Sequence, residues 1–283
     1  MTTATKRIAG FVLALAVALN LTGCGGSDQP PPGALSGTIT ASGSTALLPL
    51  AMSAKDVFEA KHEYVTVNVS GGGSFNGLTQ VAQGAVQIGN SDVEASGDQA
   101  AGLVDHKVAV APFVIVAHRD VSVTDVTMDQ LARIFKGEIT NWKEVGGQDQ
   151  KITVVSRQQS SGSRATVVAT VLKGQGDITK TAIVQDSNGK VRDGVVGTPG
   201  AIGYIDAPYF DAARMKGLKV DGVAYSVDAV TSGKWPIYAY GHMYTKGEPT
   251  GLAKSFLDFV LGEEFQNNVV EQKGFIPVSK MKK

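Results

Sequence analysis

Residues 36–45, SGTITASGST, show a short strand pattern followed by a turn rich in glycine and serine. Beyond it, residues 45–60 place apolar side chains at the i, i+3, i+4 and i+7 spacing of an amphipathic helix. A strand, a tight turn and a helix in this order are the unit from which α/β proteins are built. This segment therefore predicts an α/β fold.

The same alternation continues along the chain. Strand patterns occur at residues 64–69, 86–89, 108–117 and 152–155, and helix patterns occur at 75–83, 128–135, 163–172, 251–261 and 263–272. Thr127 and Gly137 are expected to begin and end the helix at 128–135, and Thr250 is expected to cap the helix at 251–261. Strands that alternate with helices in this way predict mainly parallel pairing.

The composition excludes some classes of function. The 283 residues include 26 Lys+Arg and 26 Asp+Glu, so the chain lacks the basic excess of a nucleic-acid-binding surface. Hydrophobic residues make up 43% and charged residues 18%, which favours a sizeable core over disorder. Glycine accounts for 34 residues, an excess that indicates tight turns or close approach of the backbone to another group.

The N-terminus has the order of a secretion signal. Lys6 and Arg7 precede an apolar run at 8–19, which is too short to span a bilayer as a stable helix. LTGC at 21–24 then resembles the lipobox of bacterial lipoproteins, which implies that Cys24 is lipidated and begins the mature chain. We expect a signal peptide at 1–23 and a tether at 24–35, hence an extracytoplasmic, lipid-anchored protein. The alternative is a buried N-terminal helix with an incidental cysteine.

Three turns between a strand and a helix share one design. They are ASGST at 41–45, SGGGS at 70–74 and RQQSSGSR at 157–164. Each offers glycine, hydroxyl side chains and the free N–H groups of a helix N-terminus, which together favour an anion. Arg157 adds a guanidinium that can bind an oxyanion through two hydrogen bonds. The simpler alternative is that these serines only cap their helices.

Asp92, in IGNSD at 88–92, indicates which anion would fit. A carboxylate among anion-binding donors is unfavourable unless the ligand brings a proton to it. Hydrogen phosphate carries such a proton, whereas sulfate near neutral pH does not. Asp92 therefore predicts selectivity for phosphate, unless it caps a turn or pairs with Arg157 or Arg164.

The ordered set of motifs resembles a known family, the phosphate-binding lipoproteins of ABC phosphate importers, which have the type II periplasmic-binding-protein fold. The resemblance rests on GST at 43–45, GGGS at 71–74, IGNSD at 88–92, IFKGEITNW at 134–142, Arg157 with SGSR at 161–164, and GAIGY at 200–204. It implies two lobes with a ligand cleft between them and a hinge of two crossings. The expected division is 36–113 with 236–283 for lobe I and 114–235 for lobe II.

The resemblance also implies a set of phosphate ligands. Together with Ser44 of the first turn, they are Thr45, Ala46 through its backbone N–H, Ser74, Asp92, Arg157, Ser161, Gly162 and Ser163. Two positions depart from the family pattern. Gln159 stands where many relatives have an acidic residue that orients the arginine, and Ser163 stands where threonine is common.

The expected function is capture of inorganic phosphate and its delivery to the membrane permease of an ABC importer, by a monomer without a cofactor, metal or catalytic residue. The alternatives are a receptor or sensor for sulfate, molybdate or arsenate, and a phosphate-releasing hydrolase. No G-x-S-x-G surrounds Ser44, Ser74 or Ser161, and the four histidines lack the close spacing of metal ligands. An enzyme therefore has little support.

Overall fold

The computed structural model describes residues 29–282, so the expected signal peptide and Cys24 lie outside the described residues. The strands are β1 (Ser36–Gly43), β2 (Tyr64–Gly71), β3 (Ile88–Ser91), β4 (Leu103–Ala117), β5 (Asp125–Val126), β6 (Thr153–Arg157), β7 (Ile183–Gln185), β8 (Ala201–Asp206), β9 (Lys216–Gly217), β10 (Lys219–Val220) and β11 (Tyr238–Lys246). The α-helices are α1 (Leu48–Lys61), α2 (Ser74–Ala82), α3 (Met128–Lys136), α4 (Gly162–Thr170), α5 (Asn188–Gly197), α6 (Val227–Thr231), α7 (Gly251–Leu261) and α8 (Glu263–Phe265).

The long strand β4 joins the two halves of the sheet. The strand order is β2-β1-β3-β11-β4-β8-β6-β7, with β9 also paired to β4. Residues 103–112 of β4 pair with β11, and residues 113–117 pair with β8, so the partner changes between Pro112 and Phe113. Strand β11 begins beside this point, where Tyr238 pairs with Pro112.

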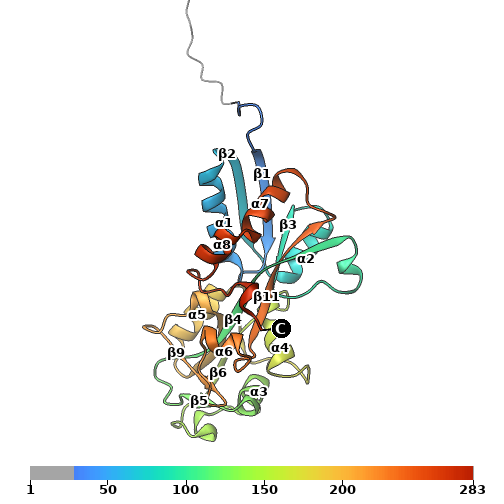
Figure 1. Ribbon diagram of the computed structural model, residues 1–283. Coiled ribbons are helices and arrows are strands. Elements are labelled where there is room, and N and C mark those ends of the chain that lie inside the picture. Colours follow the sequence, from blue (N-terminus) through green and yellow to red (C-terminus); the bar gives the residue numbers. More distant parts are fainter. Residues whose placement is uncertain (1–28, 283) are drawn as a thin grey trace, which may run out of the picture.

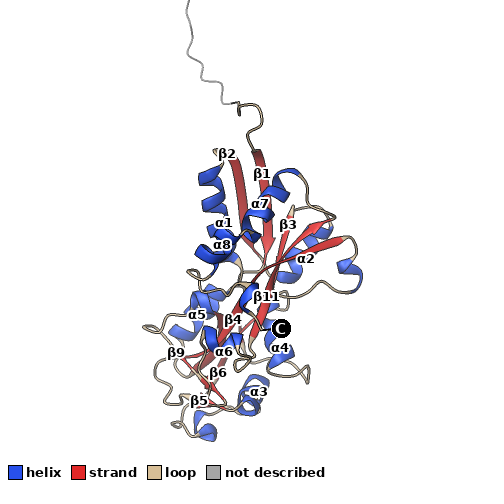
Figure 2. Cartoon of the chain, viewed as in Figure 1, coloured by secondary structure: helices blue, strands red, loops and turns tan. Residues whose placement is uncertain are grey.

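The elements separate into two groups around β4 and β11 (Figure 1). Lobe I contains β1, β2, β3, α1, α2, α7 and α8, and lobe II contains β6, β7, β8, α3, α4, α5 and α6. Helices flank the strands in both groups, as expected for an α/β protein (Figure 2). The polypeptide crosses between the groups near Pro112 and again near Tyr238.

Each lobe has its own hydrophobic core. The core of lobe I includes Ile39, Leu50, Phe58, Val67 and Phe256. The main core of lobe II includes Phe113, Phe135, Trp142, Tyr204 and Trp235. These side chains are almost wholly excluded from water, so each lobe buries enough apolar surface to hold its own shape. Motion between the lobes therefore needs little change within them.

Local sequence accounts for helix α3. The Thr127 side chain accepts a hydrogen bond from the Gln130 N–H, and the Gln130 side chain accepts one from the Thr127 N–H. This capping box satisfies N–H groups that a helix start leaves free. Gly137 ends the helix with φ +78°, a left-handed conformation that favours glycine. Both expected ends of this helix are confirmed.

Other expectations need correction. Thr250 precedes α7, but its side chain makes no capping hydrogen bond. The final helix pattern is an α-helix only at Glu263–Phe265, which is followed by a π-helical turn at Gln266–Val270. Parallel pairing holds for β1 with β2 and β3 and for β6 with β7 and β8, whereas β4 and β11 pair antiparallel with all their partners. The sheet is therefore mixed.

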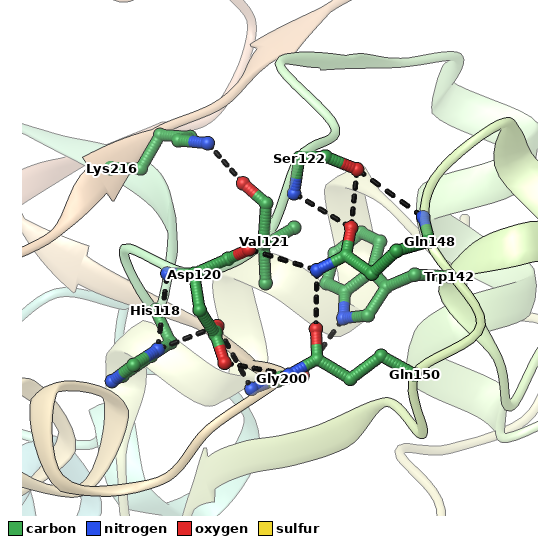
Figure 3. Close-up of polar contacts among 9 residues, drawn as sticks. All are labelled: His118, Asp120, Val121, Ser122, Trp142, Gln148, Gln150, Gly200 and Lys216. Atoms are coloured by element: carbon green, nitrogen blue, oxygen red, sulfur yellow. Dashed lines mark hydrogen bonds and ion pairs between the residues drawn. The ribbon is translucent and has the colours of Figure 1, made fainter.

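The IFKGEITNW motif at 134–142 has a structural role in lobe II. Trp142 is fully buried, and its Nε1 donates a hydrogen bond to the Gly200 carbonyl at 3.0 Å. Beside it, the Asp120 carboxylate contacts His118 Nδ1 and Gln150 Nε2, both at 2.6 Å (Figure 3). Partial burial acts to raise the pKa of Asp120, but these hydrogen bonds outweigh it and the pKa is lowered. This network fixes the loop around Trp142.

Candidate functional site

The three glycine- and serine-rich turns meet where the two lobes face each other. Two of them extend from lobe I, after β1 and after β2, and the third extends from lobe II, after β6. The Phe75 N–H of lobe I donates a hydrogen bond to the Ser160 carbonyl of lobe II at 3.2 Å. Parallel strands bring their carboxyl ends to one edge, which explains how turns far apart in sequence come together.

Asp92 lies at the centre of the polar contacts. Its carboxylate accepts hydrogen bonds from the Ser44 hydroxyl of lobe I and from the Ser163 hydroxyl of lobe II, the latter at 3.3 Å. Its backbone N–H donates to Ser74 Oγ at 2.9 Å. Four of the nine expected ligand residues therefore form one connected cluster, in which the side chain of Asp92 is nearly inaccessible to water.

The environment of Asp92 makes it a strong proton acceptor. Burial raises the pKa of Asp92, while the hydrogen bond from Ser44 and the positive charge of Arg157 act in the opposite direction. A carboxylate with a raised pKa is more basic and so accepts a proton or a hydrogen bond more strongly. Among the described residues no ion pair joins Asp92 to an arginine, so the alternative pairings with Arg157 and Arg164 are not formed.

Arg157 supplies the positive charge of the site. It is the last residue of β6, and only 2% of its surface is exposed. Nη2 donates a hydrogen bond to the Asp186 carbonyl at 2.9 Å, whereas Nε and Nη1 have no partner among the described residues. Burial lowers the pKa of Arg157, yet a guanidinium stays protonated in proteins. Two donors of a buried cation are therefore available to an anion.

The N-terminus of α4 packs directly against lobe I. Ser161 Oγ accepts a hydrogen bond from the Arg164 N–H at 3.2 Å, so this serine caps α4, and its hydroxyl can still donate a hydrogen bond. Gly162 lies so close to lobe I that an added Cβ would stand 2.2 Å from Ser74 Oγ. A side chain larger than hydrogen would collide with Ser74, so the close packing of the lobes requires glycine at this position.

Thr45 and Ala46 join the site through different contacts. The Ala46 N–H donates a hydrogen bond to Ser44 Oγ at 3.0 Å, so this expected anion donor is engaged within its own turn. Thr45 reaches lobe II, where Tyr209 donates a hydrogen bond to the Thr45 carbonyl at 2.8 Å and Asn188 Nδ2 lies 3.4 Å from Thr45 Oγ1. No local motif marks Asn188 and Tyr209, so the sequence does not predict these long-range partners.

Of the two departures from the family pattern, Ser163 lies in the central cluster, whereas Gln159 lies at the edge of the site. Gln159 is exposed, and its Oε1 accepts a hydrogen bond from Arg164 Nη1 at 2.9 Å. Arg164 also forms an ion pair with Asp177. Neither Gln159 nor Arg164 therefore contacts Asp92, and a backbone carbonyl, that of Asp186, holds the Arg157 side chain instead of an acidic residue at position 159.

Two further buried polar residues were not expected. Asp206 ends β8, and both its carboxyl oxygens lack a partner among the described residues. The side-chain amide nitrogen and oxygen of Asn90 also have no hydrogen-bond partner among the described residues. The GAIGY motif at 200–204 ends two residues before Asp206. The sequence therefore marked this region as a family motif but did not single out Asp206. A carboxyl that is fully buried at a cleft is a candidate functional group.

Two cavities border residues of the site. One of about 370 Å³ is lined by Arg157, Gln159 and Arg164, and another of about 440 Å³ is lined by Asp92, Ala165 and His242. The hydroxyls and the carboxylate at the centre are buried. Arg157 and Asp92 therefore border the cavities, whereas the serine hydroxyls of the cluster are buried.

An α/β fold of two lobes with a polar site between them is typical of two-lobed binding proteins. Comparison with known proteins supports this class. A family model described as a PBP superfamily domain matches residues 28–264, and the chain therefore belongs to that superfamily. This membership confirms the predicted fold class, a periplasmic-binding-protein-like α/β fold with two lobes.

The chain is also similar to individual phosphate-binding proteins. The chain is 46% identical to the phosphate-binding protein PstS of Bacillus subtilis over 87% of this chain and 83% of the relative. A putative phosphate ABC transporter substrate-binding protein from Clostridium perfringens, solved with bound phosphate, has a TM-score of 0.81 at 31% identity and covers 86% of this chain and 100% of its own. A phosphate transport receptor from Vibrio cholerae has a TM-score of 0.70 at 28% identity and covers 84% and 99%.

Proposed function

We propose that this protein binds inorganic phosphate between its two lobes. The observation that carries the proposal is the buried cluster around Asp92, in which hydroxyls from both lobes meet beside the two available donors of Arg157. Similarity to PstS of Bacillus subtilis and to a protein solved with bound phosphate supports the same ligand. The proposed ligand residues are the nine expected from the sequence.

Energy considerations agree with a tightly held anion. A hydrogen bond to a charged group contributes about 1.5–3 kcal/mol, so five or six of them exceed the roughly 8 kcal/mol of a micromolar complex. Part of this gain is lost to the cost of association. One arginine, hydroxyl donors and a helix N-terminus can therefore hold a dianion although the whole chain has no net charge.

We further propose that Asp92 selects the protonated anion. The P–OH group of hydrogen phosphate would donate a hydrogen bond to this carboxylate, whereas sulfate would place oxygen lone pairs against it. Leaving a buried charge opposite an acceptor costs far more than losing one contact, since the carboxylate then lacks both water and a donor. Arsenate, which has the same protonation chemistry as phosphate, would bind in the same way.

Transport is the proposed biological role. The relatives are named as phosphate-binding or ABC transporter substrate-binding proteins, which supports delivery of phosphate to a membrane permease by an extracytoplasmic receptor. We propose that this receptor is a monomer. Within residues 29–282, none of the helices has the length and apolar character needed to cross a bilayer. We propose attachment through lipid on Cys24, so Cys24→Ala should move the protein from the membrane fraction to the soluble fraction.

The lobes are proposed to open and close about the two crossings at 113/114 and 235/236. Near these positions β4 changes partner and β11 begins, and each lobe has a separate core. A binding protein of this design closes on its ligand by hinge bending, with little change inside each lobe.

A binding role without catalysis fits the contacts of the serines and histidines. Ser44 donates to Asp92 and Ser161 caps α4, while His118, His242 and His106 contact Asp120, Asp105 and Thr245, respectively. In the described part of the chain, no group of three or more His, Cys, Asp or Glu side chains is arranged to hold a metal ion. Turnover of p-nitrophenyl phosphate that Ser161→Ala abolishes would contradict this assignment.

Calorimetric titration of the purified protein with phosphate, arsenate, sulfate and molybdate tests the proposed function. We expect binding of phosphate and arsenate and much weaker binding of the other two. Arg157→Ala should weaken all four anions by a factor on the order of a hundred, because each loses two charge-assisted hydrogen bonds. Tight binding of molybdate or sulfate with none of phosphate would assign a different oxyanion to the site.

A further inference from the structure

A second carboxyl group, that of Asp206, occupies the same edge of the sheet as Arg157. Strands β6 and β8 run parallel, with Val155 opposite Gly203, so their carboxyl ends lie together. Asp206 is the last residue of β8, and Arg157 is the last residue of β6. The geometry of the sheet therefore brings the end of β8 to the proposed anion site.

The contacts of Asp206 tie it to residues from both lobes. Its backbone N–H donates a hydrogen bond to Asn188 Oδ1 at 3.2 Å, and Asn188 Nδ2 in turn lies 3.4 Å from Thr45 Oγ1 of lobe I. On its other side Asp206 pairs with Phe113 of β4, at the crossing between the lobes. Asp206 therefore sits where lobe II meets both the first turn and a crossing strand.

The carboxyl of Asp206 is in an environment that disfavours a negative charge. Its exposed fraction is 0%, and neither oxygen has a hydrogen-bond partner among the described residues. An ionised carboxylate buried without partners is costly, and such groups instead keep their proton. The neutral acid is also the only form that can donate a hydrogen bond, since it carries an O–H group.

Charged and titratable neighbours act on Asp206 from several elements. Burial and the negative charge of Asp92 hold the pKa of Asp206 well above its ordinary value. The positive charge of Arg157 and the hydrogen-bonding groups of the Asn188 side chain and the Asp206 backbone act in the opposite direction but do not outweigh them. Tyr209 and Tyr225 also lie within electrostatic reach, and burial raises the pKa of each phenol, so both stay neutral. Two neighbouring carboxyls near one site favour a state in which one is ionised and the other is protonated.

We propose that Asp206 is a further binding residue of the anion site that works in its protonated form, opposite in role to the ionised Asp92. This inference rests on the proposed function. The neutral carboxyl adds no negative charge and can donate a hydrogen bond to an anion held by Arg157. Its ionisation places a second carboxylate beside a bound dianion. Phosphate affinity therefore falls as the pH rises through the pKa of Asp206.

The test compares Asp206→Asn with the unaltered protein in full-length form. Asparagine has nearly the same shape, donates a hydrogen bond and cannot ionise, so it imitates the protonated acid at every pH. Phosphate affinity is measured by calorimetry at several pH values between 6 and 9. The ratio of the two affinities at each pH cancels the titration of phosphate itself. Asp193→Asn, which removes an exposed carboxylate on α5, is the matched control.

We expect similar affinities of Asp206→Asn and the unaltered protein at pH 6. Once the pH exceeds the pKa of Asp206, the variant should bind phosphate on the order of tenfold more tightly, because it avoids repulsion between like charges. The Asp193→Asn ratio should stay constant. A constant ratio for Asp206→Asn, or weaker binding by it at every pH, would overturn the inference while phosphate binding by the unaltered protein upheld the proposed function. No phosphate binding by the unaltered protein would overturn both.

A second measurement does not depend on the folding of the variant. Infrared difference spectra of the unaltered protein with bound phosphate, recorded at pH 6 and pH 9, report the C=O stretch of a protonated carboxylic acid. We expect this band at pH 6, and we expect it to disappear once the pH exceeds the pKa of Asp206. Absence of the band at pH 6 would show that Asp206 is ionised throughout and would contradict the inference.

Discussion

Single glycines control how closely the two lobes approach. An added Cβ on Gly73 would lie 2.5 Å from the Ser160 carbonyl oxygen, and one on Gly162 would lie 2.2 Å from Ser74 Oγ. Both contacts join lobe I to lobe II. The glycine excess of the sequence therefore has a specific explanation at these positions, where the backbone of one lobe touches the other.

Replacement of Gly162 by alanine should impair phosphate binding. The methyl group would collide with Ser74, and relief of such overpacking typically costs about 1–3 kcal/mol. We expect a loss of affinity of roughly tenfold or more by calorimetry, with little change in thermal stability without ligand, because open lobes avoid the contact. Gly197→Ala is the control, since a Cβ at this exposed position in α5 meets no atom within 4 Å. Equal affinities of both variants would contradict the proposed closure.

At the residue scale, the sequence singles out the positions whose signal comes from neighbours along the chain. The hydroxyl turns, Asp92 and Arg157 all stand at the ends of recognisable strands. Asp206, Asn188 and Tyr209 were missed because their importance comes from contacts across the lobes, such as that of Tyr209 with Thr45, 164 positions away. Burial of a polar group without a partner is also invisible before the fold is known.

At the scale of elements, local patterns predicted helices better than the sheet. Helix α7 has the expected bounds of 251–261, and α3 ends one residue beyond the expected 135. Strand β4 was expected only at 108–117, because residues 103–107 are partly exposed and include polar side chains that resemble a loop. Antiparallel pairing of β11 with β3 and β4 could not be predicted, since β11 joins the sheet from the far end of the chain.

The capping box of α3 gives a prediction about stability. Thr127→Ala removes the hydroxyl that accepts the Gln130 N–H and should lower the free energy of unfolding by about 1 kcal/mol. Thr250→Ala is the control, because Thr250 precedes α7 without a capping hydrogen bond and its loss should have a smaller effect. Urea unfolding of both variants measures the difference. A larger loss for Thr250→Ala would contradict the assignment.

At the scale of the whole molecule, the contacts between the lobes define a closed state. Tyr209 and Asn188 reach Thr45, Ser163 reaches Asp92, and Ser160 accepts from Phe75. An anion held by donors from both lobes would add to these contacts, so ligand and closure should stabilise each other.

Tyr209→Phe tests the contribution of the lobe contacts alone. It removes one hydrogen bond of the closed state, to the Thr45 carbonyl at 2.8 Å, without touching a proposed ligand side chain. A neutral hydrogen bond contributes about 1 kcal/mol, so phosphate affinity should fall about fivefold. Selectivity between anions should stay the same. Loss of selectivity in this variant would show that Tyr209 contacts the anion itself.

We expect Asp92 to make the site selective for a protonated oxyanion, and calorimetry measures this selectivity. The ratio of phosphate to sulfate affinity is measured for the unaltered protein and for Asp92→Asn at neutral pH. We expect a large ratio in the first and a much smaller one in the second, because asparagine can donate a hydrogen bond to sulfate. Equal affinity of the unaltered protein for both anions, or the same ratio in both proteins, would contradict the claim.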